Sequence, residues 1–184
     1  MFVRKGTPVD SLIVGGSHER RRRAGTENVP GIVGLAKAIE LAMHSIEDGT
    51  MTRLAGMRDK LEAGVLALSS TGLNGALADG MPAPRVANTT NIWFDHLEGE
   101  ALVIALDLKG IAISGGSACH SGATEPSHVL MAMGLDKARA RASLRFSMLK
   151  TVTEAQIDRV LEIVPEAVQS LRALAPVSAG TLGD

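Results

Sequence analysis

Apolar side chains recur every three or four residues in several long stretches of this sequence, and short runs of β-forming residues lie between the later ones. A period of 3.6 residues predicts an amphipathic helix, and clusters of Val, Ile, Thr and aromatic residues predict strands. The predicted helices lie at 30–48, 52–68, 98–109, 126–133 and 153–171, the strands at 2–4, 85–94, 111–113 and 143–146, and a loop at 69–84. The mixed order of elements, without an internal repeat, predicts an α/β fold.

The ends of the long helices carry recognisable signals. Pro30 suits a first helical turn, where its missing N–H is not needed, and Gly49 is a natural stop. Thr153 and Gln156 form a capping box at the start of the last helix, in which Pro165 is expected to produce a kink.

Composition excludes several classes of protein. Of the 184 residues 45% are apolar, enough to bury a core, and a net charge of -1 gives no global attraction to nucleic acid or an anionic membrane. A single cysteine excludes an internal disulfide framework, and the histidines have no partners at metal-ligand spacing. No apolar run is expected to reach the roughly 20 residues that span a bilayer. We therefore expect a cytoplasmic protein without a metal site.

The single cysteine, Cys119, lies in the run Ser-Gly-Gly-Ser-Ala-Cys-His-Ser-Gly at 114–122. This run offers almost no apolar wall, so it favours a reactive thiol over the small buried hydrophobe that a lone cysteine otherwise suggests. His120 adjoins the thiol as a proton acceptor or as a positive neighbour that favours thiolate, and Ser117 is a second candidate supporting residue. A thiolate on a glycine-rich tether can reach a substrate and carry its product elsewhere.

Arg145 lies between Leu144 and Phe146 in the predicted strand at 143–146. Alternate strand residues point to opposite faces, so Arg145 faces a cleft or solvent if its neighbours face the core. A guanidinium there can bind a planar carboxylate through two parallel hydrogen bonds. A structural ion pair and plain solvent exposure remain as alternatives.

A basic segment at 18–28 precedes the first long helix and contains four consecutive arginines, at 20–23. Gly25 and Thr26 follow them and are typical of an anion site that uses a hydroxyl and backbone N–H groups. The arginines also allow a nucleic-acid-binding patch, which the neutral net charge and the scarcity of aromatic residues disfavour, or a solvated basic loop.

These three segments, in this order and spacing, resemble the C-terminal part of the cysteine desulfurases of the NifS/IscS type, which are pyridoxal-phosphate enzymes of the class V aminotransferase family. The resemblance covers nearly the whole chain except its tail. It runs through residues 3–6, 15–16, 18–20, 23–30, 98–100, 117–119, 125–130, 143–147, 153–154 and 157–158. It implies the C-terminal part of a fold-type I pyridoxal-phosphate enzyme: a small α+β domain, with a sheet of a few strands packed by helices, plus the tail of the large domain.

The resemblance implies roles for three residues. Cys119 matches the cysteine that takes the sulfur of a cysteine substrate as a persulfide, which leaves alanine. Arg145 matches the residue that binds the substrate carboxylate. Thr26 matches the threonine that reaches across a dimer interface to the cofactor phosphate of the other subunit.

The chain departs from the family pattern at four positions. Arg21 and Leu149 stand where the family usually has Gly, so their side chains are expected to alter the backbone geometry of these loops. Gly115 replaces a usual Ser, and His120 replaces a usual small hydroxyl residue.

In the family, the lysine that forms the Schiff base with pyridoxal phosphate precedes the segment matched by residues 1–3. None of the six lysines of this chain lies in the family's lysine motif. We therefore expect a fragment that does not turn over cysteine alone. Residues 1–50 are expected to be the end of the large cofactor domain with its linking helix, 51–175 the small domain with the cysteine loop, and 176–184 a disordered tail.

The leading hypothesis is the C-terminal portion of a cysteine desulfurase that delivers sulfur to iron–sulfur clusters or related pathways. The implied partners are the cysteine substrate, a sulfur acceptor or iron–sulfur scaffold protein, and either a second copy in a homodimer or a cofactor-bearing half. A selenocysteine-specific relative is a near variant. The main alternative is a non-catalytic persulfide carrier or dimerisation module, and the third is a nucleic-acid-binding basic loop.

Overall fold

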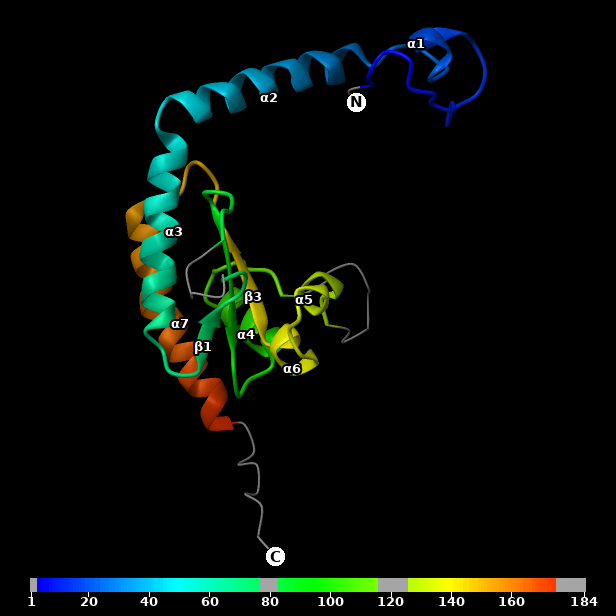
Figure 1. The fold of residues 1–184 in the computed structure, drawn as a ribbon. Coiled ribbons are helices and arrows are strands. Elements are labelled where there is room, and N and C mark those ends of the chain that lie inside the picture. Colours follow the sequence, from blue (N-terminus) through cyan, green and yellow to red (C-terminus); the bar gives the residue numbers. More distant parts are fainter. Residues whose placement is uncertain (1–2, 77–82, 116–125, 175–184) are drawn as a thin grey trace, which may run out of the picture. The chain divides into compact units, whose positions relative to one another are not determined.

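The computed structural model describes residues 3–76, 83–115 and 126–174. Its contacts divide the chain into two compact units, Met1–Asp48 and Gly49–Asp184, called unit 1 and unit 2 below (Figure 1). The predicted disordered tail at 176–184 lies outside the described residues.

Unit 1 contains a four-residue turn, α1 (His18–Arg21), and one long helix, α2 (Val29–Glu47). The side chain of Asn28 caps α2 by accepting a hydrogen bond of 3.1 Å from the backbone N–H of Gly31. Pro30 lies in the first turn, where its lack of an N–H removes no helical bond. The helix predicted at 30–48 is confirmed.

Helix α2 exposes many of its large apolar side chains. They are Val29, Ile32, Val33, Leu35, Ile39, Leu41, Met43 and Ile46. By length and composition alone α2 could cross a membrane, since its mean hydropathy is 1.3, but a helix buried within a larger soluble protein meets the same criterion. The expectation that no apolar run would be long enough for a span was therefore wrong.

The strand predicted at 2–4 is not present in its described part, because Val3 and Arg4 form no strand. A strand needs a hydrogen-bonded neighbour to be stable, and the described residues of unit 1 contain no other strand.

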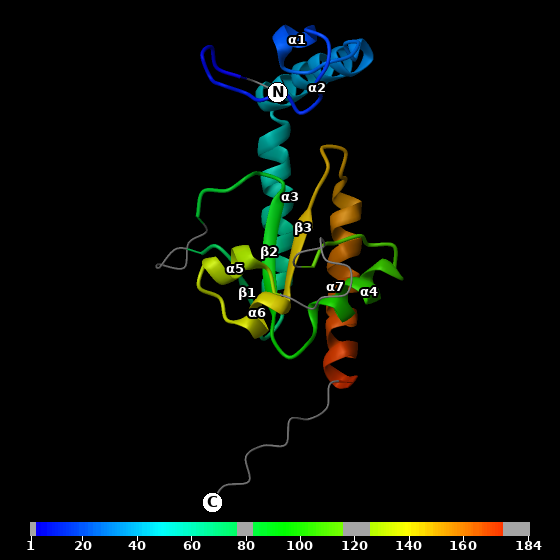
Figure 2. The same ribbon diagram turned by 90° about the vertical axis from the view of Figure 1, so that its right-hand side faces the viewer.

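Unit 2 is a small antiparallel sheet packed by helices, as the sequence predicts. Its elements are α3 (Thr50–Leu66), β1 (Thr71–Leu73), β2 (Thr89–Phe94), α4 (Gly99–Asp107), α5 (His128–Ala132), α6 (Lys137–Arg141), β3 (Ser143–Ser147) and α7 (Glu154–Leu174). The strand order is β1-β2-β3, and each strand is antiparallel to its neighbour. Figure 1 shows α3 and α7 together on one side of the sheet and α5 and α6 on the other, which Figure 2 turns toward the viewer.

The core of unit 2 lies between the sheet and the pair α3 and α7. In β2, the side chains of Ile92 and Phe94 are fully buried, and their alternate neighbours are partly exposed. Leu144 and Phe146 of β3 are buried on the same face of the sheet. Burial of each such side chain stabilises the fold by about 1.5–3 kcal/mol, so this core fixes which residues of β2 and β3 face outward.

Two short elements escaped the sequence prediction. Strand β1 lies inside the predicted loop at 69–84, and α6 was not predicted. Asp136 caps the N-terminus of α6, and its carboxylate accepts a hydrogen bond of 2.9 Å from the backbone N–H of Arg139. Both elements are too short to show a hydrophobic period.

Of two further predicted strands, one is absent and the other is shorter than expected. The segment at 111–113 forms no strand, and only a single bridge between Ser114 and Arg145 follows it. Strand β2 begins later than predicted, because a turn at residues 87–88 precedes it. Arg85, ahead of this turn, forms an ion pair of 2.8 Å with Glu62 of α3.

Helix α7 begins with the predicted capping box. The backbone N–H of Thr153 donates to Gln156 Oε1 at 3.0 Å, and the backbone N–H of Gln156 donates to Thr153 Oγ1 at 3.3 Å. The helix continues through Pro165 to Leu174, so Pro165 does not end it.

Arg172, near the end of α7, forms hydrogen bonds to two turns of unit 2, at residues 69–70 and at residues 95–96. Its guanidinium donates to the carbonyl oxygens of Ser69 at 2.8 Å, Ser70 at 2.9 Å and Asp95 at 3.1 Å. Ser70 and His96 in these turns have φ values of 56° and 65°, in the left-handed region that non-glycine residues rarely adopt. Hydrogen bonds from a charged donor offset this backbone strain. We call this arrangement the Arg172 clamp.

Candidate functional site

Arg145 lies in the middle of β3 with its side chain exposed, and its neighbours Leu144 and Phe146 are buried. The predicted orientation of Arg145 is confirmed. Its backbone N–H donates to Ser114 at 2.8 Å, and its carbonyl accepts from the N–H of Ser114 at 3.3 Å. Within the described part of the chain the guanidinium has no hydrogen-bond or ion-pair partner, which argues against a structural ion pair. It is therefore available to an anion.

The predicted nucleophile Cys119 and its candidate supports His120 and Ser117 lie outside the described residues. Gly115, which follows Ser114, is the last described residue before them. The described part of the cysteine run therefore ends one residue after Ser114, whose backbone pairs with that of Arg145.

A polar network that the sequence did not reveal lies next to Arg145. Asn91 of β2 is its cross-strand partner. Asn74, just after β1, donates through Nδ2 to Asn91 Oδ1 at 2.6 Å and to Ser143 Oγ at 2.8 Å. The alternation in β2 indicates that Asn91 faces outward, but only the strand register brings it beside Arg145.

A second arginine in unit 2, Arg139, already interacts with other side chains of the protein. Arg139 of α6 lies over the Trp93 ring, 4.5 Å from the ring centre, and its Nε lies 3.9 Å from the carboxylate of Asp95. This contrast makes Arg145, rather than Arg139, the candidate anion-binding group.

Thr26 belongs to unit 1 and is exposed. Its carbonyl accepts a hydrogen bond of 2.6 Å from Arg23 Nη1, and its hydroxyl has no partner within the described residues. It lies just ahead of Asn28, which caps the 19-residue helix α2. A hydroxyl donor near the positive end of a helix has the chemistry needed to bind a phosphate.

The basic segment has an unusual backbone. Glu19, Arg20 and Arg21 have φ values of 51°, 56° and 64°. Each left-handed non-glycine residue costs about 1–2 kcal/mol, so a glycine would fit the position of Arg21 without strain. Leu149, the other residue in place of a usual glycine, is not among the residues with positive φ.

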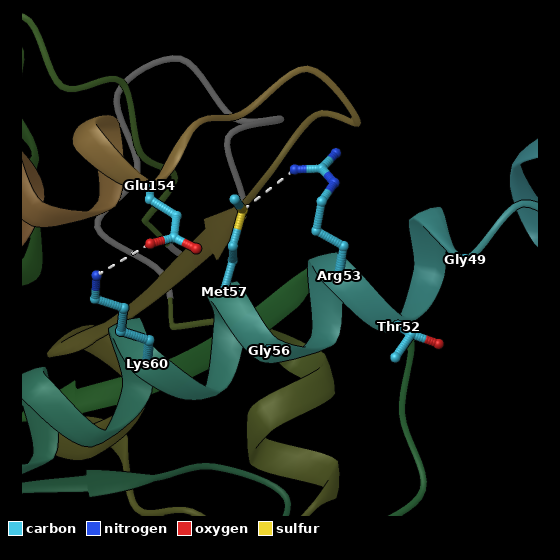
Figure 3. Close-up of a pocket in the computed structure, with 7 residues that line it drawn as sticks. All are labelled: Gly49, Thr52, Arg53, Gly56, Met57, Lys60 and Glu154. Atoms are coloured by element: carbon cyan, nitrogen blue, oxygen red, sulfur yellow. Dashed lines mark hydrogen bonds and ion pairs between the residues drawn. The ribbon is translucent and has the colours of Figure 1, made fainter.

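The pocket of unit 2 shown in Figure 3 contains none of the predicted site residues. Its volume is about 580 Å³, and its lining residues are Gly49, Thr52, Arg53, Gly56, Met57, Lys60 and Glu154. Arg53 donates to the carbonyls of Lys150 and Val152, and Lys60 forms an ion pair of 2.5 Å with Asp158. The hydrogen bond to Asp158 raises the pKa of Lys60 above its usual 10.5. The cations of this pocket are thus already paired with protein groups.

No group of three or more His, Cys, Asp or Glu side chains that could hold a metal occurs in the described ranges. The candidate functional residues form two separate sets, Arg145 with its neighbours in unit 2 and Thr26 in unit 1.

Comparison with known proteins gives a consistent result. Residues 11–160 match the family model described as aminotransferase class-V. The cysteine desulfurase IscS of Methanosarcina thermophila is 49% identical over 178 residues, which is 97% of this chain and 43% of that protein. A cysteine desulfurase of Nostoc sp. is 50% identical over 177 residues, 96% of this chain and 43% of its own length.

Two solved structures share the fold. A NifS-like protein superposes with a TM-score of 0.77 at 33% identity, covering 92% of this chain and 42% of its own. A NifS-like protein from Rickettsia africae gives a TM-score of 0.74 at 27% identity, covering 89% and 41%. The chain thus spans less than half the length of these relatives.

Proposed function

Because the chain belongs to the class-V aminotransferase family, as the sequence resemblance predicted, we propose that it is the sulfur-accepting portion of a cysteine desulfurase. The proposal is carried by the backbone bridge between Ser114, at the start of the run 114–122, and Arg145, whose guanidinium has no partner among the described residues. This arrangement suits a reaction in which an amino acid is held by its carboxylate while a nearby thiol takes an atom from its side chain.

The family depends on pyridoxal phosphate, and the chemistry of Thr26 fits part of that cofactor. Its exposed hydroxyl, ahead of the N-terminus of α2, would donate to the phosphate. When bound, the cofactor supplies an electron sink for the amino-acid substrate. We propose that the Schiff-base lysine and the remaining cofactor contacts come from the part of the relatives' length that this chain does not span.

Arg145 holds the substrate in this scheme. Its planar guanidinium donates two parallel hydrogen bonds to the α-carboxylate of cysteine, which fixes both position and orientation. The backbone bonds to Ser114 hold the strand residue that carries this group. We propose that the substrate side chain is then directed toward the thiol of Cys119.

Cys119 acts as the sulfur acceptor. Its thiolate forms an S–S bond with the substrate sulfur, the substrate Cβ–S bond breaks, and the carbon fragment takes up a proton and leaves as alanine. One cysteine and one thiol give one alanine and one persulfide, so no oxidant is needed. His120 and Ser117 are proposed to support the thiolate.

Cysteine desulfurases use cysteine as substrate and act as dimers. We propose that this chain works in the cytoplasm as a homodimer or joined to a cofactor-bearing half. An acceptor or iron–sulfur scaffold protein would take the persulfide sulfur from Cys119.

Two measurements test the proposal. The full chain is incubated with a low-molecular-weight persulfide donor, and Cys119 is expected to gain one sulfur atom by mass spectrometry while Cys119→Ser gains none. The chain is also co-purified with the amino-terminal portion of the Nostoc relative, and alanine release from L-cysteine is measured with both versions. Alanine release that survives Cys119→Ser would overturn the assignment of the nucleophile.

A persulfide carrier, in which Cys119 only accepts sulfur, is the second candidate. A carrier would accept sulfur on Cys119 from the donor, but the co-purified pair would release no alanine from L-cysteine.

A further inference from the structure

The register of the sheet brings one more polar side chain to Arg145. Asn91 is the direct cross-strand partner of Arg145 and lies on the same face of the sheet. The N–H and C=O of Arg145 bond Ser114 on one side, and the carbonyl of Asn91 accepts from Asn74 on the other. Asn91 and Arg145 therefore form a non-hydrogen-bonded antiparallel pair. In such a pair the two Cα atoms lie roughly 4.5 Å apart, and the side chains are closer together than in a hydrogen-bonded pair.

A chain of hydrogen bonds fixes which end of the Asn91 amide is free. The Ser143 hydroxyl uses its only hydrogen to donate to the carbonyl of Arg139 at 2.7 Å. The Ser143 oxygen must then accept from Asn74, at 2.8 Å, so the group presented by Asn74 is its NH₂. The same NH₂ donates to Asn91 Oδ1 at 2.6 Å.

Asn91 consequently points its oxygen toward Asn74 and keeps its own NH₂ unused. Within the described ranges, Nδ2 of Asn91 has no acceptor, and neither has the guanidinium of Arg145. Two donor groups without acceptors thus stand side by side on a half-exposed sheet face. Such a pair matches a ligand that is rich in acceptors.

We propose that Asn91, oriented by Asn74 and Ser143, is a second carboxylate-binding residue beside Arg145. A carboxylate held by two bonds to a guanidinium keeps further lone pairs, and the Asn91 NH₂ donates to one of them. The bond from Asn91 therefore fixes how the carboxylate is rotated about the line that joins it to the Arg145 guanidinium. This inference rests on the proposed role of Arg145 and adds to it a residue that orients the same ligand.

The test uses the full chain labelled with ¹⁵N and titrated with L-alanine, at constant ionic strength. L-alaninamide, which lacks the carboxylate, is the control ligand. The side-chain NH₂ resonances of Asn91 and the Nε–H resonance of Arg145 are expected to shift together with L-alanine and to stay unchanged with L-alaninamide. This readout needs no variant.

Three variants separate the parts of the inference. Asn91→Ala is expected to weaken L-alanine binding about tenfold, the loss typical of one hydrogen bond to a charged group. Asn74→Ala should weaken it less, and the matched control Thr89→Ala, on the same face of β2, should leave it unchanged.

Two results would overturn the inference in different ways. If Arg145 shifts with L-alanine while Asn91 does not, or if Asn91→Ala binds as the wild type, then Asn91 has no such role and the role of Arg145 stands. If neither residue shifts, or if Arg145→Ala binds L-alanine as the wild type does, the proposed role of Arg145 fails and that of Asn91 fails with it.

Discussion

Ser114 and Arg145 exchange two backbone hydrogen bonds at the outer edge of β3. The edge strand that carries the candidate carboxylate-binding group is thereby bonded to Ser114, the first residue of the run 114–122 that contains Cys119. Because these bonds use only the backbone, the side chain of Arg145 plays no part in the sheet.

Replacing Arg145 should therefore separate function from stability. Arg145→Ala is expected to change the free energy of unfolding by less than about 0.5 kcal/mol, because the guanidinium has no partner in the described residues. Urea unfolding followed by circular dichroism checks this. A loss of more than about 2 kcal/mol, typical of a broken buried pair, would restore the alternative of a structural ion pair.

The buried carboxylate of Glu62 should be far more important for stability. It is 9% exposed, and its oxygens bind Arg85 at 2.8 Å and the hydroxyl of Thr90 at 2.5 Å. Glu62→Ala leaves the Thr90 hydroxyl without this acceptor and Arg85 with only its 4.0 Å contact to Asp59, so we expect a loss of about 2–3 kcal/mol by urea unfolding. The control Asp158→Ala breaks a solvent-screened pair with the exposed Lys60 and should cost much less. Equal effects of the two variants would contradict this difference.

Glycines of unit 2 should respond oppositely to an added methyl group. A Cβ at Gly99 would collide with the carbonyl oxygen of Arg141, whereas a Cβ at Gly56 in α3 meets nothing within 4 Å. Gly99→Ala is expected to destabilise unit 2 by about 1–3 kcal/mol, and Gly56→Ala to stabilise it by about 1 kcal/mol through helix propensity. Thermal unfolding of both variants measures the difference, and the same sign for both would contradict the packing around Gly99.

The left-handed turn of the basic segment predicts a stabilising substitution. Arg21 has a φ of 64°, so Arg21→Gly should relieve about 1 kcal/mol of backbone strain. Arg22 has a φ of -91°, and Arg22→Gly should instead gain nothing. Amide hydrogen exchange across the basic segment compares the two variants, and greater protection is expected for Arg21→Gly alone.

The ion pair of Lys60 with Asp158 should make the free energy of unfolding decrease at high pH. The hydrogen bond to Asp158 raises the pKa of Lys60 above 10.5, so its contribution is fully present below that pH and is lost as the pH rises through the folded-state value. Unfolding by urea at a series of alkaline pH values should show this small loss. Lys60→Met should remove it, and an unchanged slope in that variant would assign the loss to other groups.

The long helices follow from local sequence, whereas the small elements depend on tertiary contacts. Apolar periodicity and end signals suffice for α2, α3 and α7, which begin within a few residues of their predicted starts. Strand β1 depends on its antiparallel pairing with β2, in which Gly72 lies opposite Trp93. A side chain at Gly72 would collide with the indole of Trp93, a contact invisible in the sequence.

The candidate site also combines features that local sequence predicts with features that depend on tertiary structure. The orientation of Arg145 follows from its position between two apolar residues, and its proposed role came from the resemblance. Asn91 was missed because its importance depends on the register that sets it opposite Arg145 and on Asn74, which is distant in sequence. For α6 a local signal did exist, since Asp136 is a good helix cap.

The Arg172 clamp limits how many residues can be removed from the carboxyl end of unit 2. A version that stops before Arg172 would leave the carbonyls of Ser69, Ser70 and Asp95 without their common donor, and the turns at Ser70 and His96 would lose the contacts that offset their strain. A version that stops after Leu174 keeps all three bonds. A fluorescent reporter or affinity handle placed beyond Leu174 should therefore leave the sheet and the Arg145 face intact.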